Sequence, residues 1–432
     1  MNYLWTDGVT PPTGQQLRGE VRTDVCVIGG GMAGVLCAAE LSARGIDNVL
    51  VEARQIGGGI TRGTTAVLSA QHDLLYMQLA KTYGKERALQ YLHLNLDALQ
   101  KFRRMAERID CDLETRPSVM YSATGQDRLR EEAAFLQELG FPAVYTTDPG
   151  LPFPTADAVI YPEMAQFHPL RFLYGVAQGL RLYTDSMVTR LDGTTALTEH
   201  GKIIAKKVIV ATHFPFINRR GLYFLKQYQK RSYIIAYENT PDLHCTVDNA
   251  GKEGFYFRNY KNLLLIGGGD HRTGKKGGGY RAVEEFARQY FPDAREAYRW
   301  SNQDCMSLDG IPYIGRYSPA MPDVYTATGF NHWGMTTSMA AATILCDMIE
   351  GKESPDAAVF APQRSMLHRQ LFCNLGATVV DFAIPTVRRC PHLGCALRYN
   401  AAEHSWDCPC HGSRFDRDGG LIDNPAMRDA HV

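Results

Sequence analysis

Hydrophobic and polar positions near the start of the chain follow a strand–helix–strand order. Residues 23–28 form an apolar run that predicts a short buried strand. A helical spacing of apolar residues begins at Val35 and continues to Gly45, and a second apolar run at residues 48–51 predicts another strand. We therefore expect a β–α–β unit at the N-terminal end.

The middle of the chain changes from helical to strand-like spacing. Residues 74–140 are rich in helical patterns, whereas strand-like runs dominate residues 141–259. Residues 206–213 then form another buried apolar strand, and residues 338–349 form an apolar helix. This succession predicts an α/β region that is interleaved with an α+β region.

The glycines between the first strand and the first helix predict a dinucleotide site. Gly29, Gly31 and Gly34 have the spacing that allows a tight turn, close approach of a pyrophosphate and packing of the helix on the strand. Glu52 ends the second strand, where a carboxylate can bind a ribose hydroxyl. An ordinary glycine turn, the alternative, would not require Glu52. Residues 267–269 are followed by a loop-like sequence, so no separate NAD(P)H domain is expected.

Two cysteine–histidine motifs lie close to the C-terminal end of the sequence. Cys390 and His392 form C-x-H, and Cys408 and His411 form C-x-x-H. Two thiolates on one iron and two imidazoles on the other suit a 2Fe–2S cluster with a raised potential of about −150 to +300 mV. A structural zinc ion accepts the same ligand types and stays as the alternative. Zinc does not, however, explain the additional cysteine in each motif.

Three further stretches accompany these motifs. A run of small donor residues at 57–65 follows Glu52, residues 309–315 read DGIPYIG, and residues 324–336 lead into the apolar helix. The N-terminal amides of that helix would face an electron-rich ring carbonyl. Together with the two motifs, these stretches resemble the FAD-dependent oxidoreductases of the D-amino-acid oxidase and glycine oxidase type, fused to a C-terminal Rieske 2Fe–2S domain.

The resemblance implies a fold and a set of binding residues. The fold would be an α/β FAD-binding domain, Rossmann-like and of the glutathione-reductase type, interleaved with an antiparallel-sheet α+β substrate domain, plus a small all-β Rieske-like module. Cys395 and Cys410 form a disulfide in many such modules. The residues expected to hold FAD are Gly29, Gly31, Met32, Ala33, Gly34, Glu52, Ala53, Arg54, Thr61, Thr64, Thr65, Val188, Ala211, Thr212, Gly329, Trp333, Gly334, Met335 and Thr336. The cluster ligands would be Cys390, His392, Cys408 and His411.

The domain limits follow from the same resemblance. Residues 1–75, 180–220 and 300–364 are expected to form the FAD-binding domain, and residues 76–179 and 221–299 the substrate domain. Residues 365–432 would then form a linker and a minimal Rieske-like module. Because so short a module rarely forms a sufficient core alone, we expect it to lean on the flavoprotein or on another subunit.

The two cofactors together predict a reaction. A flavin can accept a hydride from the carbon beside an amine nitrogen, and a 2Fe–2S cluster can pass electrons on singly. We therefore expect oxidation of a C–N bond in a small-molecule amine or amino acid, with an external acceptor protein or a quinone-linked carrier. The built-in exit favours a dehydrogenase over an oxidase. The alternatives are a non-catalytic electron carrier or redox sensor, and a flavoenzyme with a structural zinc tail.

Three side chains are candidate catalytic groups. His72 and His332 could face the flavin, and Arg258, on an aromatic strand, could pair with a substrate carboxylate. The competing interpretation is that both histidines are hydrogen-bonded structural residues and that Arg258 is a solvated charge at a sheet edge.

The composition of the chain limits the classes of partner and the location that we expect. The 46 basic and 46 acidic residues give zero net charge, which argues against nucleic acid or an anionic membrane as an obligatory partner. No apolar run reaches the roughly 18 residues of a membrane span, and the N-terminal sequence has no signal peptide pattern. The cysteines outside the two motifs lie on apolar patterns and are expected to be reduced, which favours a cytoplasmic location. Assembly into a homo-oligomer is compatible with the sequence.

Overall fold

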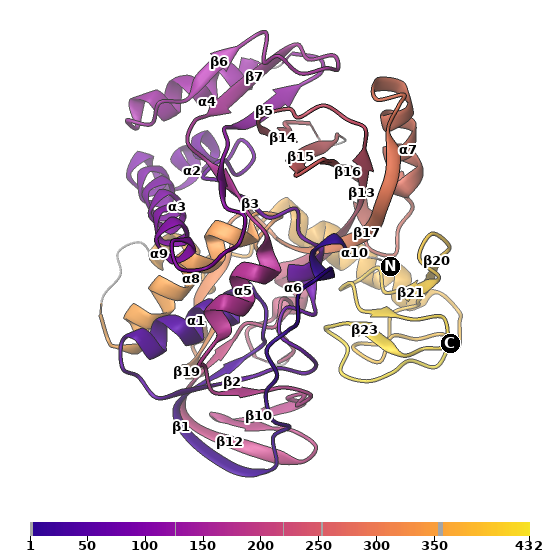
Figure 1. The fold of residues 1–432 in the computed structure, drawn as a ribbon. Coiled ribbons are helices and arrows are strands. Elements are labelled where there is room, and N and C mark those ends of the chain that lie inside the picture. Colours follow the sequence, from indigo (N-terminus) through magenta and orange to yellow (C-terminus); the bar gives the residue numbers. More distant parts are fainter. Residues whose placement is uncertain (1–2, 126, 219, 252–253, 353–356) are drawn as a thin grey trace.

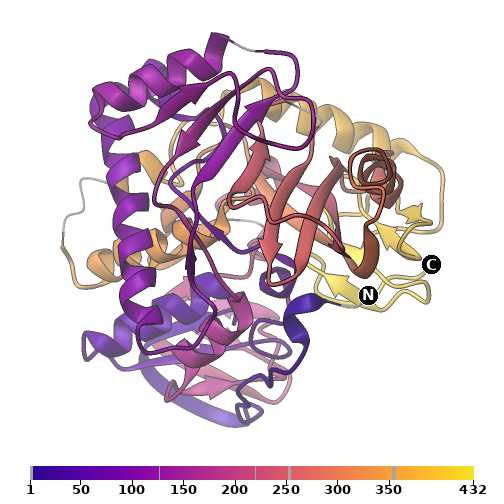
Figure 2. The same cartoon turned by 45° about the horizontal axis from the view of Figure 1, so that its top comes forward.

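The computed structural model describes residues 3–125, 127–218, 220–251, 254–352 and 357–432 (Figure 1). Two large sheets lie at opposite ends of the molecule, and a small C-terminal module lies at one side near their junction (Figures 1 and 2). The α/β, α+β and all-β parts of the expected fold are therefore confirmed. Within the described residues, every helix is too short or too polar to cross a bilayer.

The first sheet contains the predicted β–α–β unit. Its central strands run in the order β12-β1-β2-β9 and are parallel, and β19 extends it beside β12. Along β1, Val25 and Val27 belong to one apolar core, and Cys26 and Ile28 to the other, so both faces of the sheet are buried. The strands are β1 (Gly19–Ile28), β2 (Asn48–Val51), β9 (Leu182–Tyr183), β10 (Arg190–Asp192), β11 (Thr195–Leu197), β12 (Gly201–Val210), β18 (Tyr313–Ser318) and β19 (Met321–Thr328).

The second sheet is mostly antiparallel. Its order is β17-β13-β16-β15-β14-β5-β7-β6, and the pair β14–β5 is parallel. Its strands are β5 (Ser118–Ser122), β6 (Val144–Thr146), β7 (Asp157–Tyr161), β13 (Gln227–Glu238), β14 (Thr246–Asn249), β15 (Tyr256–Tyr260), β16 (Leu263–Arg272) and β17 (Arg295–Ser307). A smaller sheet joins β3 (Val67–Leu68), β8 (Ala165–Gln166) and β4 (Glu114–Thr115). The expected limit between residues 299 and 300 falls inside β17, and the domain limits stay a prediction.

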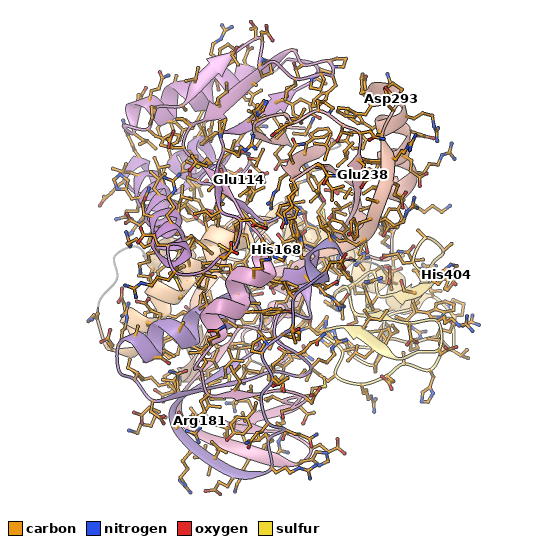
Figure 3. All side chains as sticks on the ribbon, in the orientation of Figure 1. Glu114, His168, Arg181, Glu238, Asp293 and His404 are labelled. Atoms are coloured by element: carbon orange, nitrogen blue, oxygen red, sulfur yellow. A yellow bond between two sulfur atoms is a disulfide. The ribbon has the colours of Figure 1, made fainter. Side chains whose placement is uncertain are left out.

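Helices cover both sheets. In the first region, α1 packs on α8 and on α5, and the His168 side chain accepts a hydrogen bond from the Arg171 amide at the start of α5 (Figure 3). The helices are α1 (Met32–Ala43), α2 (Tyr76–Tyr83), α3 (Lys85–Ala106), α4 (Asp127–Glu138), α5 (Pro169–Ala177), α6 (Tyr223–Lys226), α7 (Gly279–Tyr290), α8 (Gly334–Ile349), α9 (Ala357–Phe360) and α10 (Arg369–Ala383). Short 3-10 helices span Leu4–Thr6 and Ile60–Gly63.

The C-terminal module is an antiparallel sheet with two ligand loops. Its strands are β20 (Arg398–Asn400), β21 (Ser405–Asp407), β22 (Arg414–Phe415) and β23 (Leu421–Asp423), in that order. In the described part of the chain, the last element before the first ligand loop is the helix α10, not a strand. The module therefore has a small core of its own and packs on the flavoprotein, as expected from its length.

Candidate cofactor sites and the contact between them

The turn between β1 and α1 has room only for glycine at two positions. Gly29 has a φ of +110°, and a Cβ there would lie 2.5 Å from the Ala211 carbonyl oxygen. A Cβ on Gly34 would lie 1.8 Å from the Gly29 carbonyl oxygen. The backbone of α1 thus touches β1 directly, which brings the helix N-terminus to the sheet edge where a pyrophosphate binds.

Glu52 is held in place by the same turn. Its Oε2 accepts a hydrogen bond of 2.6 Å from the Gly30 amide, and its Oε1 accepts one of 2.9 Å from the Arg54 amide. Both contacts fix the carboxylate beside the glycines, so it can receive the hydroxyls of a ribose.

A single cavity of about 1130 Å³ begins at this turn and continues between the two sheets. Such a volume suits a dinucleotide together with a small substrate. The expected FAD residues that line it are Gly29, Gly31, Met32, Ala33, Glu52, Ala53, Arg54, Thr61, Thr64, Thr65, Val188, Ala211, Thr212, Trp333, Gly334 and Met335. Gly34, Gly329 and Thr336 do not line it.

The three residues outside the lining support it from behind. Gly34 packs α1 on β1, and Gly329 has a φ of +71° beside the Gln227 side chain. The Thr336 hydroxyl donates to the Ser69 carbonyl oxygen at 3.0 Å. The direct contact with FAD that was expected of these three residues stays a prediction.

His72 lines the cavity as a neutral ring. Its Nε2 lies 3.1 Å from the Thr336 hydroxyl, which already donates elsewhere and can only accept, so Nε2 carries the proton. Its Nδ1 then accepts from the Tyr91 hydroxyl at 2.7 Å. Burial lowers the pKa of His72 to about 3. Since both nitrogens are engaged, His72 is no free base, and its ring instead stacks on Trp333 with centroids 5.1 Å apart.

Arg258 does not face the cavity, so its expected role with a substrate carboxylate is wrong. The side chain is 1% exposed and donates to the carbonyl oxygens of Thr65, Ala66 and Phe167. The guanidinium also lies over the Trp5 ring, 5.0 Å from its centroid. Arg258 ties the threonine-containing loop to the second sheet, a role that no local sequence pattern reveals.

His332 lines the cavity as a charged ring. Burial alone would lower its pKa, but the Asp304 carboxylate, 2.9 Å from Nδ1, raises the pKa to about 9. The residue has a φ of +73° in the loop before α8. The partner Asp304 was not foreseen, because it lies on β17, 28 positions earlier in the chain.

Other carboxylates missed by the sequence also line the cavity. They are Asp73, Asp248 and Asp270, beside Asp304. Burial raises the pKa of Asp248 to about 7, and it raises the pKa of Asp270. The cations Lys230, 3.8 Å from Asp270, and Arg128 also line the cavity.

The four expected cluster ligands meet between the two loops of the module. The rings of His392 and His411 have centroids 4.8 Å apart. In the described part of the chain, Nδ1 of each ring is buried without a hydrogen-bond partner. A buried nitrogen lone pair without a partner is costly, so each of these atoms needs an electron-pair acceptor such as a metal ion. Cys390 and Cys408 are buried as well. This donor set fits a cluster bound by two thiolates and two imidazoles.

The additional cysteines form a bond of their own. Cys395 and Cys410 are joined by a disulfide, with Cα atoms 6.6 Å apart. The sulfur atoms of Cys395, Cys408 and Cys410 lie within 4.8 Å of one another. Because two of these three sulfurs are used in the disulfide, only Cys408 of this group is free to bind iron.

The first ligand loop and the second both contact the flavoprotein. Nε2 of His392 lies 2.7 Å from Asn218 Oδ1. Nε2 of Gln229 donates to the His411 carbonyl oxygen at 2.9 Å, and Oε1 of Gln229 lies 3.2 Å from Nε2 of His213. His213 lines the large cavity. A chain of three residues therefore leads from the cavity wall to a cluster ligand.

The end of the module forms part of the cavity wall. The side-chain amide of Asn424 donates to the carbonyl oxygens of Thr212 and Phe214 at 2.6 and 2.8 Å. Arg54 donates to the Ile422 carbonyl oxygen at 2.5 Å. The module residues that line the cavity are Leu421, Asp423, Asn424, Ala426, Met427, Arg428 and Asp429.

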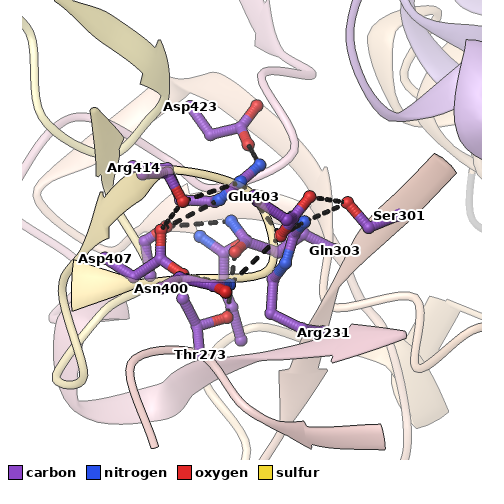
Figure 4. Close-up of polar contacts among 12 residues, drawn as sticks. Arg231, Thr273, Ser301, Gln303, Asn400, Glu403, Asp407, Arg414 and Asp423 are labelled. Atoms are coloured by element: carbon purple, nitrogen blue, oxygen red, sulfur yellow. Dashed lines mark hydrogen bonds and ion pairs between the residues drawn. The ribbon is translucent and has the colours of Figure 1, made fainter. Parts of the chain in front are cut away.

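A buried ion network fixes the module on the second sheet (Figure 4). Glu403 pairs with Arg231 and Arg414, and it also accepts a hydrogen bond from the Ser301 hydroxyl. Arg414 reaches Asp407 and Asp423 at 3.1 Å each. The side chains of Arg231 and Glu403 are each 1% exposed. A buried charge is costly without its partner, so this network favours the observed position of the module on the second sheet.

Comparison with known proteins matches this arrangement. Residues 24–348 match the family model of FAD-dependent oxidoreductases (DAO), and residues 383–432 match that of the Rieske [2Fe-2S] domain. The chain is 30% identical to YhfW of Bacillus subtilis, named as a Rieske 2Fe-2S iron-sulfur protein, over 98% of this chain and 96% of that protein. It is 25% identical to gamma-glutamylputrescine oxidoreductase of Escherichia coli, over 78% of this chain and 85% of that protein.

Comparison with solved structures supports the same fold. Glycine oxidase from Geobacillus kaustophilus superposes with a TM-score of 0.67 at 23% identity, covering 80% of this chain and all of that one. The family match covers most of the sequence, and the C-terminal match identifies the module as Rieske-type, so the zinc alternative is not supported. The chain belongs to the DAO family of FAD-dependent oxidoreductases and carries a C-terminal Rieske 2Fe–2S domain.

Proposed function

We propose that this flavoprotein oxidises a C–N bond of a small amine and releases the electrons singly through its Rieske domain. When bound, FAD accepts a hydride from the carbon beside a nitrogen, and a 2Fe–2S cluster carries one electron at a time. The observation that carries the proposal is the contact of His213, Gln229 and His411, which joins the cavity wall to a cluster ligand.

The cavity lining favours an amine over an amino acid. Asp248, Asp270 and Asp304 face it, whereas the expected carboxylate partner Arg258 is turned away. Lys230 lies near Asp270, and His332 is paired with Asp304, so these charges cancel. Among the described residues, the lining carboxylates Asp73 and Asp248 form no ion pair and carry the attraction. A cationic amine is therefore attracted on entry. Desolvation inside the cavity then favours its neutral form, which is the form that can lose a hydride.

The relative named gamma-glutamylputrescine oxidoreductase is compatible with this substrate class. We further propose that the enzyme is a dehydrogenase, because the module lines the cavity and would provide an exit for electrons beside it. In air, reduction of a one-electron acceptor should then outpace consumption of oxygen.

The substrate class is tested by anaerobic reduction of the purified holoenzyme. Monoamines, diamines, N-methylated amines and amino acids are mixed with it, and the flavin absorbance is followed. Bleaching by amines, at lower concentrations than by amino acids, is the expected result. A flavin that is bleached only by amino acids would contradict the acidic-pocket argument. A flavin that no member of the panel reduces would favour the non-catalytic carrier.

The electron exit is tested by the substitution Cys390→Ser. Without this thiolate the cluster should be lost, while the cavity and its lining remain. We expect amine-dependent bleaching of the flavin to survive and turnover with a one-electron acceptor to fall by about a hundredfold. Cys373→Ser, at an exposed cysteine outside the ligand loops, is the control. Full turnover in the Cys390→Ser variant would refute the exit.

A further inference from the structure

The helix α10 has the reverse polarity of an ordinary surface helix. Its two buried residues are polar, since Asn374 is 3% exposed and Asp381 is fully buried. Its large apolar side chains face outward instead. Their exposed fractions are 65% for Phe372, 38% for Leu375, 68% for Val379, 60% for Val380 and 57% for Phe382. A water-facing helix normally shows the opposite pattern.

Polar contacts hold the helix in this orientation. Arg272 donates to Asn374 Oδ1 at 2.9 Å. Lys275 and Arg398 pair with Asp381 at 2.8 and 3.1 Å. Turning the helix over would bury apolar groups but would also break each of these buried contacts, which is costly. The outward direction of the apolar side chains is therefore a fixed property of the fold.

The apolar surface extends past both ends of the helix. Leu367 is 81% exposed before it, and Val387 is 89% exposed after it. Leu393, inside the first ligand loop, is exposed as well, and a Cβ on Gly394 would lie 3.3 Å from the Phe382 ring. We call this surface the outer face, and it consists of Leu367, Phe372, Leu375, Val379, Val380, Phe382, Val387 and Leu393. Figure 2 shows α10 at the outside of the molecule, leading to the module.

The exposed charges on the segment that carries the outer face have one sign. Between residues 357 and 402 the only acidic residue is Asp381, which is buried and paired. Arg369 and Arg388 are exposed, and within the described residues neither forms an ion pair. The zero net charge of the whole chain thus averages over a segment that is apolar and basic.

Apolar and basic surfaces of this kind fit one occupant best. A second copy, packed by twofold symmetry, would bring the arginines of the two faces together without any acidic partner. A transient redox protein would leave the apolar side chains in water between encounters. An anionic lipid surface provides both permanent apolar cover and negative charge.

We propose that the outer face docks on an anionic membrane surface, with α10 lying in the plane of the interface. The apolar side chains would enter the boundary between headgroups and acyl chains, and Arg369 and Arg388 would meet the lipid phosphates. Because Leu393 lies one position after His392, docking places the first ligand loop at the lipid surface. The inference stands on α10 and its surroundings and does not depend on the substrate.

The experiment is flotation of the holoenzyme with lipid vesicles. Vesicles of phosphatidylcholine with about 30% phosphatidylglycerol are compared with phosphatidylcholine alone, at low and high salt. The wild type should float with the anionic vesicles and be released by salt. The double substitution Phe372→Ser, Val379→Ser should weaken binding by at least roughly tenfold. The control Val144→Ser, at a half-exposed valine on β6, should bind like the wild type.

Folding and self-association are measured on the same samples. Flavin content and thermal unfolding show whether the double variant is folded, and sedimentation velocity gives the oligomeric state. The proposal is overturned if the wild type does not float, or if the folded double variant floats equally well. A wild-type dimer that ignores vesicles and dissociates on the double substitution would assign the outer face to a second copy. A monomer that ignores vesicles would leave a protein partner as the occupant and would also refute the proposal.

Discussion

The Gly29 carbonyl oxygen sets the tightest steric limit at the dinucleotide turn. It occupies the space that a side chain on Gly34 would need. An alanine there must push α1 away from β1, and the helix N-terminus would move with it. The cofactor site therefore depends on a residue that contributes no side chain and does not line the cavity.

Gly34→Ala should abolish FAD binding or folding, because the added methyl group meets backbone rather than a flexible side chain. The measurement is the flavin-to-protein ratio after purification, with circular dichroism to report folding. The control is Gly376→Ala in α10, where a Cβ would meet no atom within 4 Å. A Gly34→Ala protein with full flavin content would show that the turn is less tight than described.

The His332–Asp304 pair gives stability a pH dependence. The ordinary pKa of 6.5 is raised to about 9 in the folded protein, so folding strengthens proton binding. The contribution is present below the unfolded pKa and is lost as the pH rises through about 9. Asp304→Asn removes it. The melting temperature difference between wild type and variant should be largest near about pH 6 and shrink by about pH 9.5. A difference that does not change with pH would contradict this assignment.

Residues whose role is dictated by the backbone or by a ligand were predictable from the sequence. Gly29, Gly31, Glu52 and most of the other expected FAD residues line one cavity, and Gly34 packs α1 on β1 behind it. Arg258 could not be assigned, because its partners are carbonyl oxygens contributed by Thr65 and Phe167, far away in the chain. Asp248 and Asp270 carry no local motif, so only the folded sheet reveals that they share a cavity.

At the scale of elements, the hairpin of β20 and β21 decides where the module sits. Glu403, in the turn between these strands, enters the space between Arg231 and Arg414 (Figure 4). Both arginines are nearly inaccessible to water. Removing the carboxylate charge would leave Arg231 without a carboxylate partner among the described residues.

Glu403→Gln should lower the stability of the docked module by ~3 kcal/mol, because it breaks a buried ion pair while leaving its shape intact. Thermal unfolding and the rate of proteolysis of the module are the measurements. Asp418→Asn, at an exposed pair in the same module, is the control and should change stability by less than about 0.5 kcal/mol. Equal stability of the two variants would mean that the network in Figure 4 does not hold the module.

The periodic elements were the ones that the sequence indicated well. The strands β1, β2 and β12 and the helix α8 appear where apolar spacing predicts them, although α8 begins four residues earlier, at Gly334. The helix α10 lies in the segment that was expected to be a linker. Its outward apolar face conflicts with the rule that such faces turn inward, and only the polar partners of Asn374 and Asp381 explain it.

At the scale of the whole molecule, the C-terminal module forms part of the wall of the large cavity. Asn424 of the module binds the carbonyl oxygen of Thr212, 212 positions earlier in the sequence. Each site alone could be predicted from its motif, but their contact depends on how the module docks, and no periodic pattern encodes that. The contact turns a flavoprotein and an iron–sulfur domain into one path for electrons, in our proposal.

The most direct test of that path is anaerobic rapid mixing of the oxidised holoenzyme with an amine substrate. The flavin absorbance and the electron paramagnetic resonance of the cluster are followed together in one reaction. The account predicts that the cluster becomes reduced within a single turnover, and that this step is lost in Cys390→Ser. A flavin that is fully reduced while the cluster stays oxidised throughout would contradict it.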